Sequence, residues 1–338
     1  MNIEENKSLK PYNTFGINVN ARFFLEVNTV LQLQKALQLS AYPNYFILGG
    51  GSNMLLLKDI EDLVLHINLK GITVVEEDED RVIVKAMAGE NWHEFVQWTL
   101  KQDYGGLENL SLIPGNVGTA PIQNIGAYGV ELKDSFVSCE AMHIESQELE
   151  EFFTEDCEFG YRDSVFKGKK KGKYIITAVK FKLTKHNHQL HTHYGAIEAE
   201  LEKLNIVSPT IKDVSNAVIN IRKSKLPDPK AIGNSGSFFK NPVISKKTFN
   251  AFIRKNKNAP YYELEDGTYK IPAGWLIEQC GFKGKRYGDA GVHSQQALVL
   301  VNHDSATGKE ILDLAKKIQQ CVKDNFNITI DPEVNIIK

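Results

Sequence analysis

The 338-residue sequence has few cysteines and no long apolar run. Its four cysteines, Cys139, Cys157, Cys280 and Cys321, are widely separated and form no CxxC pair. This pattern disfavours disulfides and a cysteine metal site, and it is typical of a reducing cytosol. No apolar stretch approaches the ~20 residues of a membrane-spanning helix, and residues 1–10 lack the apolar centre of a signal peptide. We therefore expect a cytoplasmic protein that is not associated with a membrane.

The sequence also lacks an excess of charge of either sign. The 40 Lys and Arg residues and 42 Asp and Glu residues leave a net charge of −2, so no general attraction to nucleic acid or to an anionic membrane is predicted. A hydrophobic fraction of 42% is ordinary for a globular protein. The length is sufficient for two or three domains.

Four histidines in HNHQLHTHYG, at positions 186, 188, 191 and 193, resemble a metal cluster. They lack the usual zinc spacing and a nearby carboxylate. A strand edge or loop is therefore favoured over a metal site.

Glycine is concentrated in two segments, of which Leu112–Leu132 is the longer. It reads LIPGNVGTAPIQNIGAYGVEL and has no charged residue before Glu131. Surface loops are usually polar, whereas glycine lets a backbone approach a ligand closely. The segment is therefore either a binding surface for a large flat cofactor, held by backbone N–H groups, or a tightly packed buried turn. Its residues alone leave both interpretations open.

The second glycine-rich segment, Tyr45–Leu57, reads YFILGGGSNMLLL. The GxGxxG dinucleotide fingerprint requires a helix after the turn, and MLLLKD is too short and too apolar to be one. The pattern favours a strand, a turn and a second strand, with successive N–H groups suited to a pyrophosphate. A plain hairpin is the alternative, although three glycines followed by Ser-Asn exceed what a hairpin needs.

Hydrophobic periodicity predicts strands first, then helices and strands, which favours an α+β fold. Strands are expected over residues 22–27, 46–48, 54–57, 63–67, 72–75, 82–86, 136–144, 174–183, 297–301, 328–330 and 334–337, the last two paired with each other. Helices are expected over residues 31–39, 91–100, 196–204, 211–225, 245–256, 274–280 and 305–325. Thr29 is the expected N-cap of the first helix.

Nine short segments, in order along nearly the whole chain, resemble the UDP-N-acetylenolpyruvoylglucosamine reductases. They are NTFGI (13–17), LGGGSN (48–53), AGENW (88–92), IPGNVGTAPIQNIGAYG (113–129), GYRDSVFK (160–167), KLPDPK (225–230), GNSGSFFKNP (233–242), AGWLIEQCGFKG (273–284) and DPEVNII (331–337). One such match would carry little weight, but nine in the right order are specific. The segment around Tyr194 is similar to the subclass that carries a tyrosine loop.

The resemblance implies an α+β fold with two parts. One is a two-subdomain FAD-binding domain of the PCMH (vanillyl-alcohol-oxidase-like) type, at about 17–185, and the other is an α+β substrate-binding domain. The expected boundaries are 1–68 for the first FAD subdomain, with the tail 320–338 returning to it, 69–218 for the second, and 219–319 for the substrate domain.

The same resemblance implies FAD as cofactor and NADPH as hydride donor. Because the two glycine-rich segments contain no His or Cys, we expect the flavin to be non-covalent. The residues expected to hold FAD are Gly49, Gly50, Gly51, Ser52, Asn53, Pro114, Gly115, Gly118, Thr119, Ile122, Gln123, Gly126 and Ala127.

Reduction of an enol ether conjugated to a carboxylate needs a flavin, a group that stabilises the enolate, and a proton donor. The residues leave Ser235 and Ser237 as competing donors, and a buried, desolvated hydroxyl is one interpretation of Ser237. The resemblance assigns the proton to Ser237 and stabilisation of the enol to Arg162 and Glu333. Without it, Arg162 would be read as a salt bridge to Asp163, and Glu333 as a carboxyl at a strand edge.

The UDP group of the substrate requires cations and amides around its diphosphate. By resemblance, the candidates are Lys225, Asn241, Lys283 and Gln296, with Tyr194 as the tyrosine that gates the substrate. A single lysine among 40 basic residues is more often a solvated charge.

We therefore predict a monomeric cytoplasmic flavoenzyme that uses NADPH to reduce enolpyruvyl UDP-GlcNAc to UDP-N-acetylmuramate for peptidoglycan. One alternative is another FAD oxidase or dehydrogenase of the same cofactor-binding superfamily. Such an enzyme would not require the GNSGSFFKNP motif or the carboxyl of the C-terminal DPEV motif. The second alternative is a non-catalytic nucleotide-sugar-binding protein without flavin.

Overall fold

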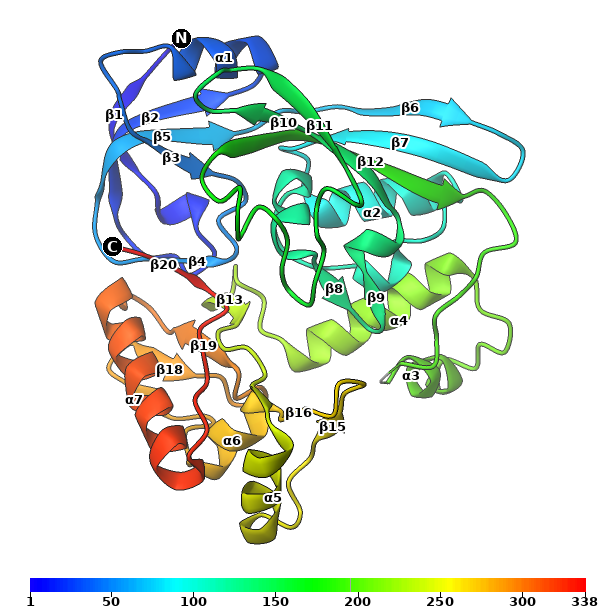
Figure 1. The fold of residues 1–338 in the computed structure, drawn as a ribbon, viewed down its shortest axis with the longest axis vertical. Helices are drawn as coiled ribbons and strands as arrows, with labels where there is room; N and C mark the ends of the chain where they lie inside the picture. Colours follow the sequence, from blue (N-terminus) through cyan, green and yellow to red (C-terminus); the bar gives the residue numbers. More distant parts are fainter. Residues whose placement is uncertain (195) are drawn as a thin grey trace. The chain divides into compact units, whose positions relative to one another are not determined.

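A computed structural model describes residues 1–194 and 196–338 of the chain. The chain divides into two compact units, each of which is described by itself (Figure 1). Unit 1 comprises residues 1–7, 21–50 and 60–224, and unit 2 comprises residues 8–20, 51–59 and 225–338.

Unit 1 begins with a sheet whose strands lie in the order β1-β2-β5-β3. These strands are β1 (Glu4–Ser8), β2 (Asn20–Val27), β5 (Ile60–Ile67) and β3 (Tyr45–Leu48). Both β2 and β3 run parallel to β5, and helix α1 (Val30–Leu37) buries Leu33, Ala36 and Leu37 in the same core cluster. The predicted cap is confirmed, since Thr29 accepts a hydrogen bond from the Gln32 N–H.

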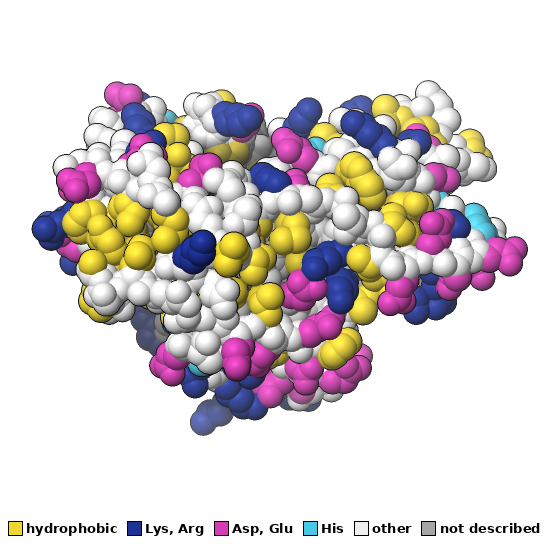
Figure 2. Space-filling model, turned by 90° about the horizontal axis from the view of Figure 1, so that it is seen from above, with side chains coloured by type: hydrophobic (Ala, Val, Ile, Leu, Met, Phe, Trp, Pro, Cys, Tyr) yellow, Lys and Arg dark blue, Asp and Glu magenta, His cyan; other side chains and the backbone are white. Residues whose placement is uncertain are grey.

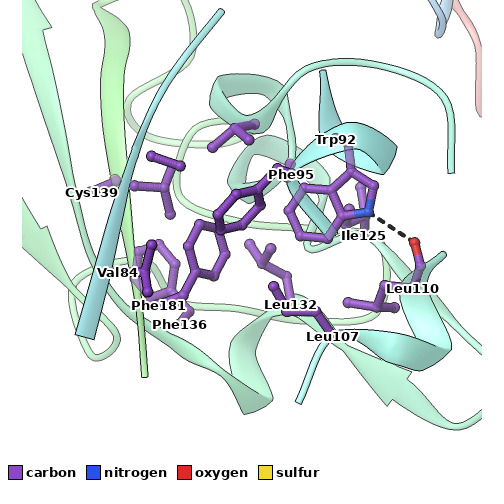
Figure 3. Packing of buried hydrophobic residues seen from close by; sticks show 14 of the residues in the cluster. Val84, Trp92, Phe95, Leu107, Leu110, Ile125, Leu132, Phe136, Cys139 and Phe181 are labelled. Atoms are coloured by element: carbon purple, nitrogen blue, oxygen red, sulfur yellow. Dashed lines mark hydrogen bonds between the residues drawn. The ribbon is translucent and has the colours of Figure 1, made fainter. Parts of the chain in front are cut away.

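A second, antiparallel sheet in unit 1 has the order β11-β10-β12-β7-β6. Its strands are β6 (Ile72–Glu77), β7 (Arg81–Met87), β10 (Phe136–His143), β11 (Leu149–Phe153) and β12 (Tyr174–Thr184). Helix α2 (Trp92–Lys101) packs on it through an aromatic core, in which the Trp92 and Phe181 rings lie 5.9 Å apart (Figure 3). The Trp92 Nε1–H donates to the Leu110 carbonyl at 2.9 Å, so this buried polar group has a hydrogen-bond partner.

The remainder of unit 1 carries short elements and two helices. The short elements are η2 (Glu108–Leu110), η3 (Val117–Thr119), η4 (Pro121–Gln123), β8 (Gly126–Ala127), β9 (Val130–Glu131) and η5 (Leu132–Asp134). Helices α3 (Ile197–Lys203) and α4 (Ile211–Lys225) share a small apolar core.

Unit 2 contains an antiparallel sheet of order β13-β19-β18-β17, with α7 packed against β18 and β19 (Figure 1). Its strands are β13 (Gly233–Ser237), β17 (Arg286–Tyr287), β18 (Ala290–Val292) and β19 (Val299–Asn302). A small sheet joins β14 (Val243–Ile244), β15 (Tyr262–Glu263) and β16 (Tyr269–Lys270). The helical elements are η1 (Lys10–Tyr12), α5 (Lys246–Lys255), α6 (Ala273–Gln279) and α7 (Gly308–Phe326).

The predicted strand, turn and second strand over residues 45–57 are confirmed. The alternative of a plain hairpin is not, because β3 pairs with β5 whereas β4 (Met54–Leu56) pairs in parallel with β20 (Asn335–Ile337). One sequence-based pairing is wrong, namely that of residues 328–330 with 334–337. Residues 328–330 are not a strand, and the C-terminal strand instead pairs with β4.

The mixed surface charge and the polarity of the described helices agree with the balanced charge and the lack of long apolar runs in the sequence. Basic and acidic side chains intermingle over the face drawn in Figure 2. Within residues 1–194 and 196–338, no helix has both the length and the apolar character needed to cross a bilayer.

Candidate functional site

The two glycine-rich segments lie directly against each other in unit 1. A Cβ added to Gly50 would lie 2.8 Å from Asn116 Oδ1 and 2.9 Å from Gly115 Cα. One added to Gly49 would lie 2.6 Å from Thr119 Cγ2. Real Cβ atoms do not approach backbone this closely, so Gly50 cannot be replaced unless Gly115 and Asn116 move. The sequence alone did not predict that these two segments contact each other.

Gly118 shows that the longer segment is also packed into the unit. Its added Cβ would lie 2.5 Å from Ala88 Cβ, and its N–H donates to the Ala88 carbonyl at 2.9 Å. By contrast, Ile122 is 37% exposed. One part of the segment is therefore a tightly packed turn, and another part is exposed.

The last three residues of the GGGSN run belong to unit 2. Gly51 has φ +59°, and a Cβ there would lie 1.9 Å from the Tyr12 carbonyl oxygen, so only glycine fits. Two residues later, Asn53 contacts the C-terminal segment: its Nδ2 donates to the Glu333 carbonyl at 3.4 Å. The Asn53 carbonyl accepts from the Asn335 N–H at 3.1 Å. One predicted FAD residue therefore lies beside one predicted catalytic residue.

Arg162 is held in an uncommon backbone conformation beside the glycine-rich segment. Its φ is +55°, a region that non-glycine residues seldom occupy and that is found at functional sites. The guanidinium Nη2 donates to the Gly126 carbonyl at 2.7 Å, and the Arg162 carbonyl accepts from Lys167 Nζ at 3.0 Å. These contacts direct the guanidinium toward Gly126, one of the residues expected to bind FAD.

Arg222 of α4 is a second cation in this region, and the sequence analysis did not identify it. Its Nε donates to the Leu112 carbonyl at 3.3 Å, and it lies beside the Tyr128 hydroxyl. Burial lowers the pKa of Arg222; the neighbouring Tyr128 opposes this shift and Arg162 adds to it. A spacing of four residues from the buried Val218 is a signal that could have placed Arg222 at the edge of the apolar face.

Tyr194 packs against Gly129 of the longer glycine-rich segment, residues 112–132. It is 57% exposed, and a Cβ on Gly129 would lie 3.2 Å from the Tyr194 Cβ. Buried Asn109 bridges the two segments, because its Nδ2 donates to the Tyr128 carbonyl at 3.0 Å and to the His191 carbonyl at 2.8 Å. The next residue, 195, lies outside the described part of the chain.

Three of the four histidines before Tyr194 contact separate partners. His186 contacts Asp80 Oδ1 at 2.8 Å, His188 contacts Thr184 Oγ1 at 2.7 Å, and His193 contacts Glu198 Oε1 at 2.5 Å. Among the described residues, no three His, Cys, Asp or Glu side chains are placed to hold a metal ion.

The interpretation of Ser237 as a buried hydroxyl is wrong: Ser237 is exposed, and Ser235 is the buried serine of the pair. The reason is the backbone of Gly236, whose φ of +66° lies at a register shift between Asn234 and Ser237. This bulge interrupts the alternation of side chains along β13. The Ser235 hydroxyl contacts Thr14 Oγ1 at 3.3 Å and the Met54 carbonyl at 3.4 Å.

The strand that carries Ser237 continues directly into contact with the C-terminal segment. The Glu333 N–H donates to the Phe238 carbonyl at 2.8 Å, and the Lys240 N–H donates to the Asp331 carbonyl at 2.9 Å. Unit 2 thus brings GNSGSFFKNP and DPEV together across about 95 residues of sequence, which no local pattern revealed.

Two of the residues expected to bind the UDP group meet at the first turn of α6. Asn241 Oδ1 accepts from the Ala273 N–H at 2.9 Å. A Cβ on Gly274 would lie 3.4 Å from Gln296 Oε1, so Gln296 borders the same turn. Lys225 is exposed at the end of α4, whereas Lys283 is paired with Glu278 at 3.0 Å. The ion pair partly neutralises Lys283 and weakens its case as a diphosphate ligand.

Known proteins match this chain over its full length. It is 58% identical over 337 residues to UDP-N-acetylenolpyruvoylglucosamine reductase of Flavobacterium johnsoniae, with 100% of both chains covered. The chain belongs to the UDP-N-acetylenolpyruvoylglucosamine reductase family. The enzyme of the same name from Chromobacterium violaceum is 49% identical, with 97% of each chain covered.

Family-model matches agree with this membership, and solved structures show the same fold. Residues 228–337 match the C-terminal domain of UDP-N-acetylenolpyruvoylglucosamine reductase, and residues 21–147 match an FAD binding domain. The crystal structure of the reductase from Thermus caldophilus shares the fold, with TM-score 0.69 and 24% identity over 100% of both chains. A solvent-stable cholesterol oxidase has a TM-score of 0.51 at 11% identity, with 98% of this chain and 86% of the oxidase covered. The predicted family, the α+β fold class and FAD as cofactor are confirmed.

Proposed function

We propose that this protein reduces the enolpyruvyl group of UDP-N-acetyl-3-O-(1-carboxyvinyl)-glucosamine to give UDP-N-acetylmuramate, with NADPH as the reductant. The observation that carries this proposal is the 58% identity to a reductase of that name over both full chains. The presence of Arg162, Ser237 and Glu333 in the matching motifs supports it, because each supplies a group that the chemistry requires.

The residues of the glycine-rich segments fit a flavin nucleotide held without a covalent bond. The close approach of Gly50 to Gly115 and Asn116 places the backbones of the two segments in direct contact. Bound there, FAD would supply the hydride-transfer chemistry between NADPH and the alkene of the sugar. The predicted FAD residues, from Gly49 to Asn53 and from Pro114 to Ala127, would hold it mainly through backbone amides.

The reaction places negative charge on the near carbon and the carboxylate of the substrate. A guanidinium forms paired hydrogen bonds with a carboxylate, so Arg162 would stabilise the enolate, and Glu333 would assist from the C-terminal segment. Arg222 adds a second positive charge close to Arg162. Ser237 would then donate its hydroxyl proton to the near carbon. Its exposure favours it over Ser235, whose hydroxyl already contacts Thr14 and Met54.

The remaining assignments complete the proposal. Lys225, Asn241 and Gln296 would bind the diphosphate, Lys283 would do so only after release from Glu278, and Tyr194 would cover the bound sugar. The domain boundaries remain 1–68 with 320–338, 69–218 and 219–319. The enzyme would act as a cytoplasmic monomer without nucleic-acid partners. Its product would enter peptidoglycan synthesis and so serve cell shape and division.

Product analysis tests the proposed activity. Denaturing the purified yellow protein should release FAD into the supernatant, and NADPH consumption should depend on the enolpyruvyl sugar. Mass spectrometry should then find a product with two more hydrogen atoms than the sugar. Rapid NADPH oxidation by air alone would indicate an oxidase, and a colourless chain that cannot be loaded with FAD would indicate a binding protein.

A further inference from the structure

Two cysteines of unit 2 that take no part in the proposed reaction meet between α6 and α7. Cys280 follows the last residue of α6, and Cys321 lies in α7. Asn325, one turn after Cys321, donates its Nδ2 to Cys321 Sγ at 3.2 Å and to Cys280 Sγ at 3.7 Å. Both sulfur atoms therefore contact the same nitrogen, although the residues are 41 positions apart in sequence.

Aromatic packing fixes the two helices at this point. The rings of Trp275 in α6 and Phe326 in α7 lie 5.8 Å apart, and Phe252 of α5 contacts both. Because both helices are held next to the thiols, the sulfur atoms are kept close without a covalent bond.

The chain contains a second thiol pair that serves as a natural comparison. Cys139 and Cys157 interact with each other in the core of unit 1, and both are fully buried. Cys280 and Cys321 are only partly buried, and their shared partner Asn325 is exposed. A small oxidant dissolved in water can therefore reach the second pair but not the first.

We propose that Cys280 and Cys321 form a redox-active dithiol, which peroxide oxidises to an intrachain disulfide that links α6 to α7. In the first step, one thiolate attacks a peroxide oxygen and the O–O bond breaks; a sulfenic acid forms, and the released hydroxide takes up the proton that the thiol had lost and becomes water. In the second step, the other thiol attacks that sulfur and displaces hydroxide, which takes up the thiol proton and leaves as water. Overall, two thiols and one hydrogen peroxide give one disulfide and two waters.

The surroundings of the two sulfurs decide which reacts first. Burial, together with the neighbouring Cys321, raises the pKa of the Cys280 thiol to about 12, so Cys280 keeps its proton at neutral pH. The thiolate is the reactive form. The shorter of the two Asn325 contacts, at 3.2 Å, goes to Cys321 Sγ, and the contact with Cys280 Sγ is 3.7 Å. Cys321 is therefore the attacking sulfur, and Cys280 resolves the sulfenic acid.

Helix α6 connects the thiols to residues of the proposed substrate site. Its first turn contacts Asn241 and Gln296, and Cys280 follows its last turn. This consequence rests on the proposed function: closing the disulfide shifts α6 and weakens binding of the UDP-sugar, which raises its KM by about twofold or more.

The test is peptide mapping of the FAD-loaded, full-length protein after treatment with hydrogen peroxide. Free thiols are alkylated before digestion, first in the native state and then after denaturation. We expect one disulfide-linked peptide pair that contains Cys280 and Cys321, while Cys139 and Cys157 remain reduced and become alkylated only on denaturation. Free Cys280 and Cys321 after treatment, separate overoxidation of the two, or a disulfide to another cysteine would overturn the proposal.

Single substitutions separate the two chemical roles. Cys280→Ser removes the resolving thiol, so a dimedone adduct should accumulate at Cys321; Cys321→Ser should give much less adduct at Cys280. Equal labelling in both variants would refute the assigned order. FAD content and circular dichroism check that the variants are folded, and the mapping does not depend on the enzyme's activity. A KM for the sugar that stays the same in the oxidised wild type would refute only the coupling through α6.

Discussion

Replacing each of the two serines of β13 in turn tests the proposed proton donor. Ser237 is exposed after the bulge at Gly236, whereas Ser235 is buried against Thr14 and Met54. Ser237→Ala removes only the hydroxyl of an exposed side chain, so we expect little loss of folding stability. Ser235→Ala removes a hydroxyl from two internal contacts.

The expected magnitudes separate the two variants. A positioned proton donor contributes ~10²–10⁴-fold to a rate, so Ser237→Ala should slow reduction of the sugar by that factor. It should leave reduction of FAD by NADPH unchanged. The contacts of Ser235, at 3.3 and 3.4 Å, are long for hydrogen bonds. Ser235→Ala should therefore lower the free energy of unfolding by about 1 kcal/mol and leave both half-reactions near wild type.

Stopped-flow absorbance of each half-reaction is the assay, with chemical denaturation as the stability measurement. Ser237→Cys is the matched variant, because a thiol can also donate a proton and should restore part of the lost rate. The reasoning is refuted if Ser235→Ala blocks the second half-reaction while Ser237→Ala does not.

Three further predictions concern charge, cofactor and pH. Arg162→Ala and Glu333→Gln should keep FAD and its reduction by NADPH but slow reduction of the sugar by about 10²-fold or more; stopped-flow rates near wild type in both would show that the roles are wrongly assigned. Gly50→Ala should weaken FAD binding by about 5–150-fold, the equivalent of 1–3 kcal/mol of overpacking, as measured by flavin fluorescence titration. Gly168→Ala is the control, since its added Cβ meets nothing closer than 3.9 Å, and equal affinities in the two variants would contradict the packing account. Burial and nearby His303 lower the pKa of His293, so the unfolded chain takes up its proton first as the pH falls below about 6.5, and stability should decrease there. Urea denaturation should show a weaker loss in His293→Gln, and identical pH profiles would exclude this group.

The sequence predicted the local structure better than the pairing of distant segments. Thr29 caps α1 because the cap depends only on neighbouring residues. The partner of β4 could not be predicted in this way, because it lies about 280 residues later, in β20. An apolar strand defines which face is buried but not which other strand satisfies its backbone.

The same limit applies to the candidate site. Motif resemblance proposed roles for Arg162, Ser237 and Glu333 individually, but the contact between Phe238 and Glu333 required the fold. The exposure of Ser237 depends on a bulge at Gly236, and a glycine between two serines gives no unique sign of one. Arg222 was missed because a charged residue on an amphipathic helix is usually solvated.

The central claim, that this chain transfers hydride from NADPH to an enolpyruvyl UDP-sugar through FAD, is tested most directly by an anaerobic spectral titration. Adding one equivalent of NADPH should bleach the yellow absorbance of the bound flavin. Adding the enolpyruvyl UDP-sugar, still without oxygen, should then restore it and yield UDP-N-acetylmuramate. Flavin that stays bleached after the sugar is added, but recovers its colour in air, would contradict the account.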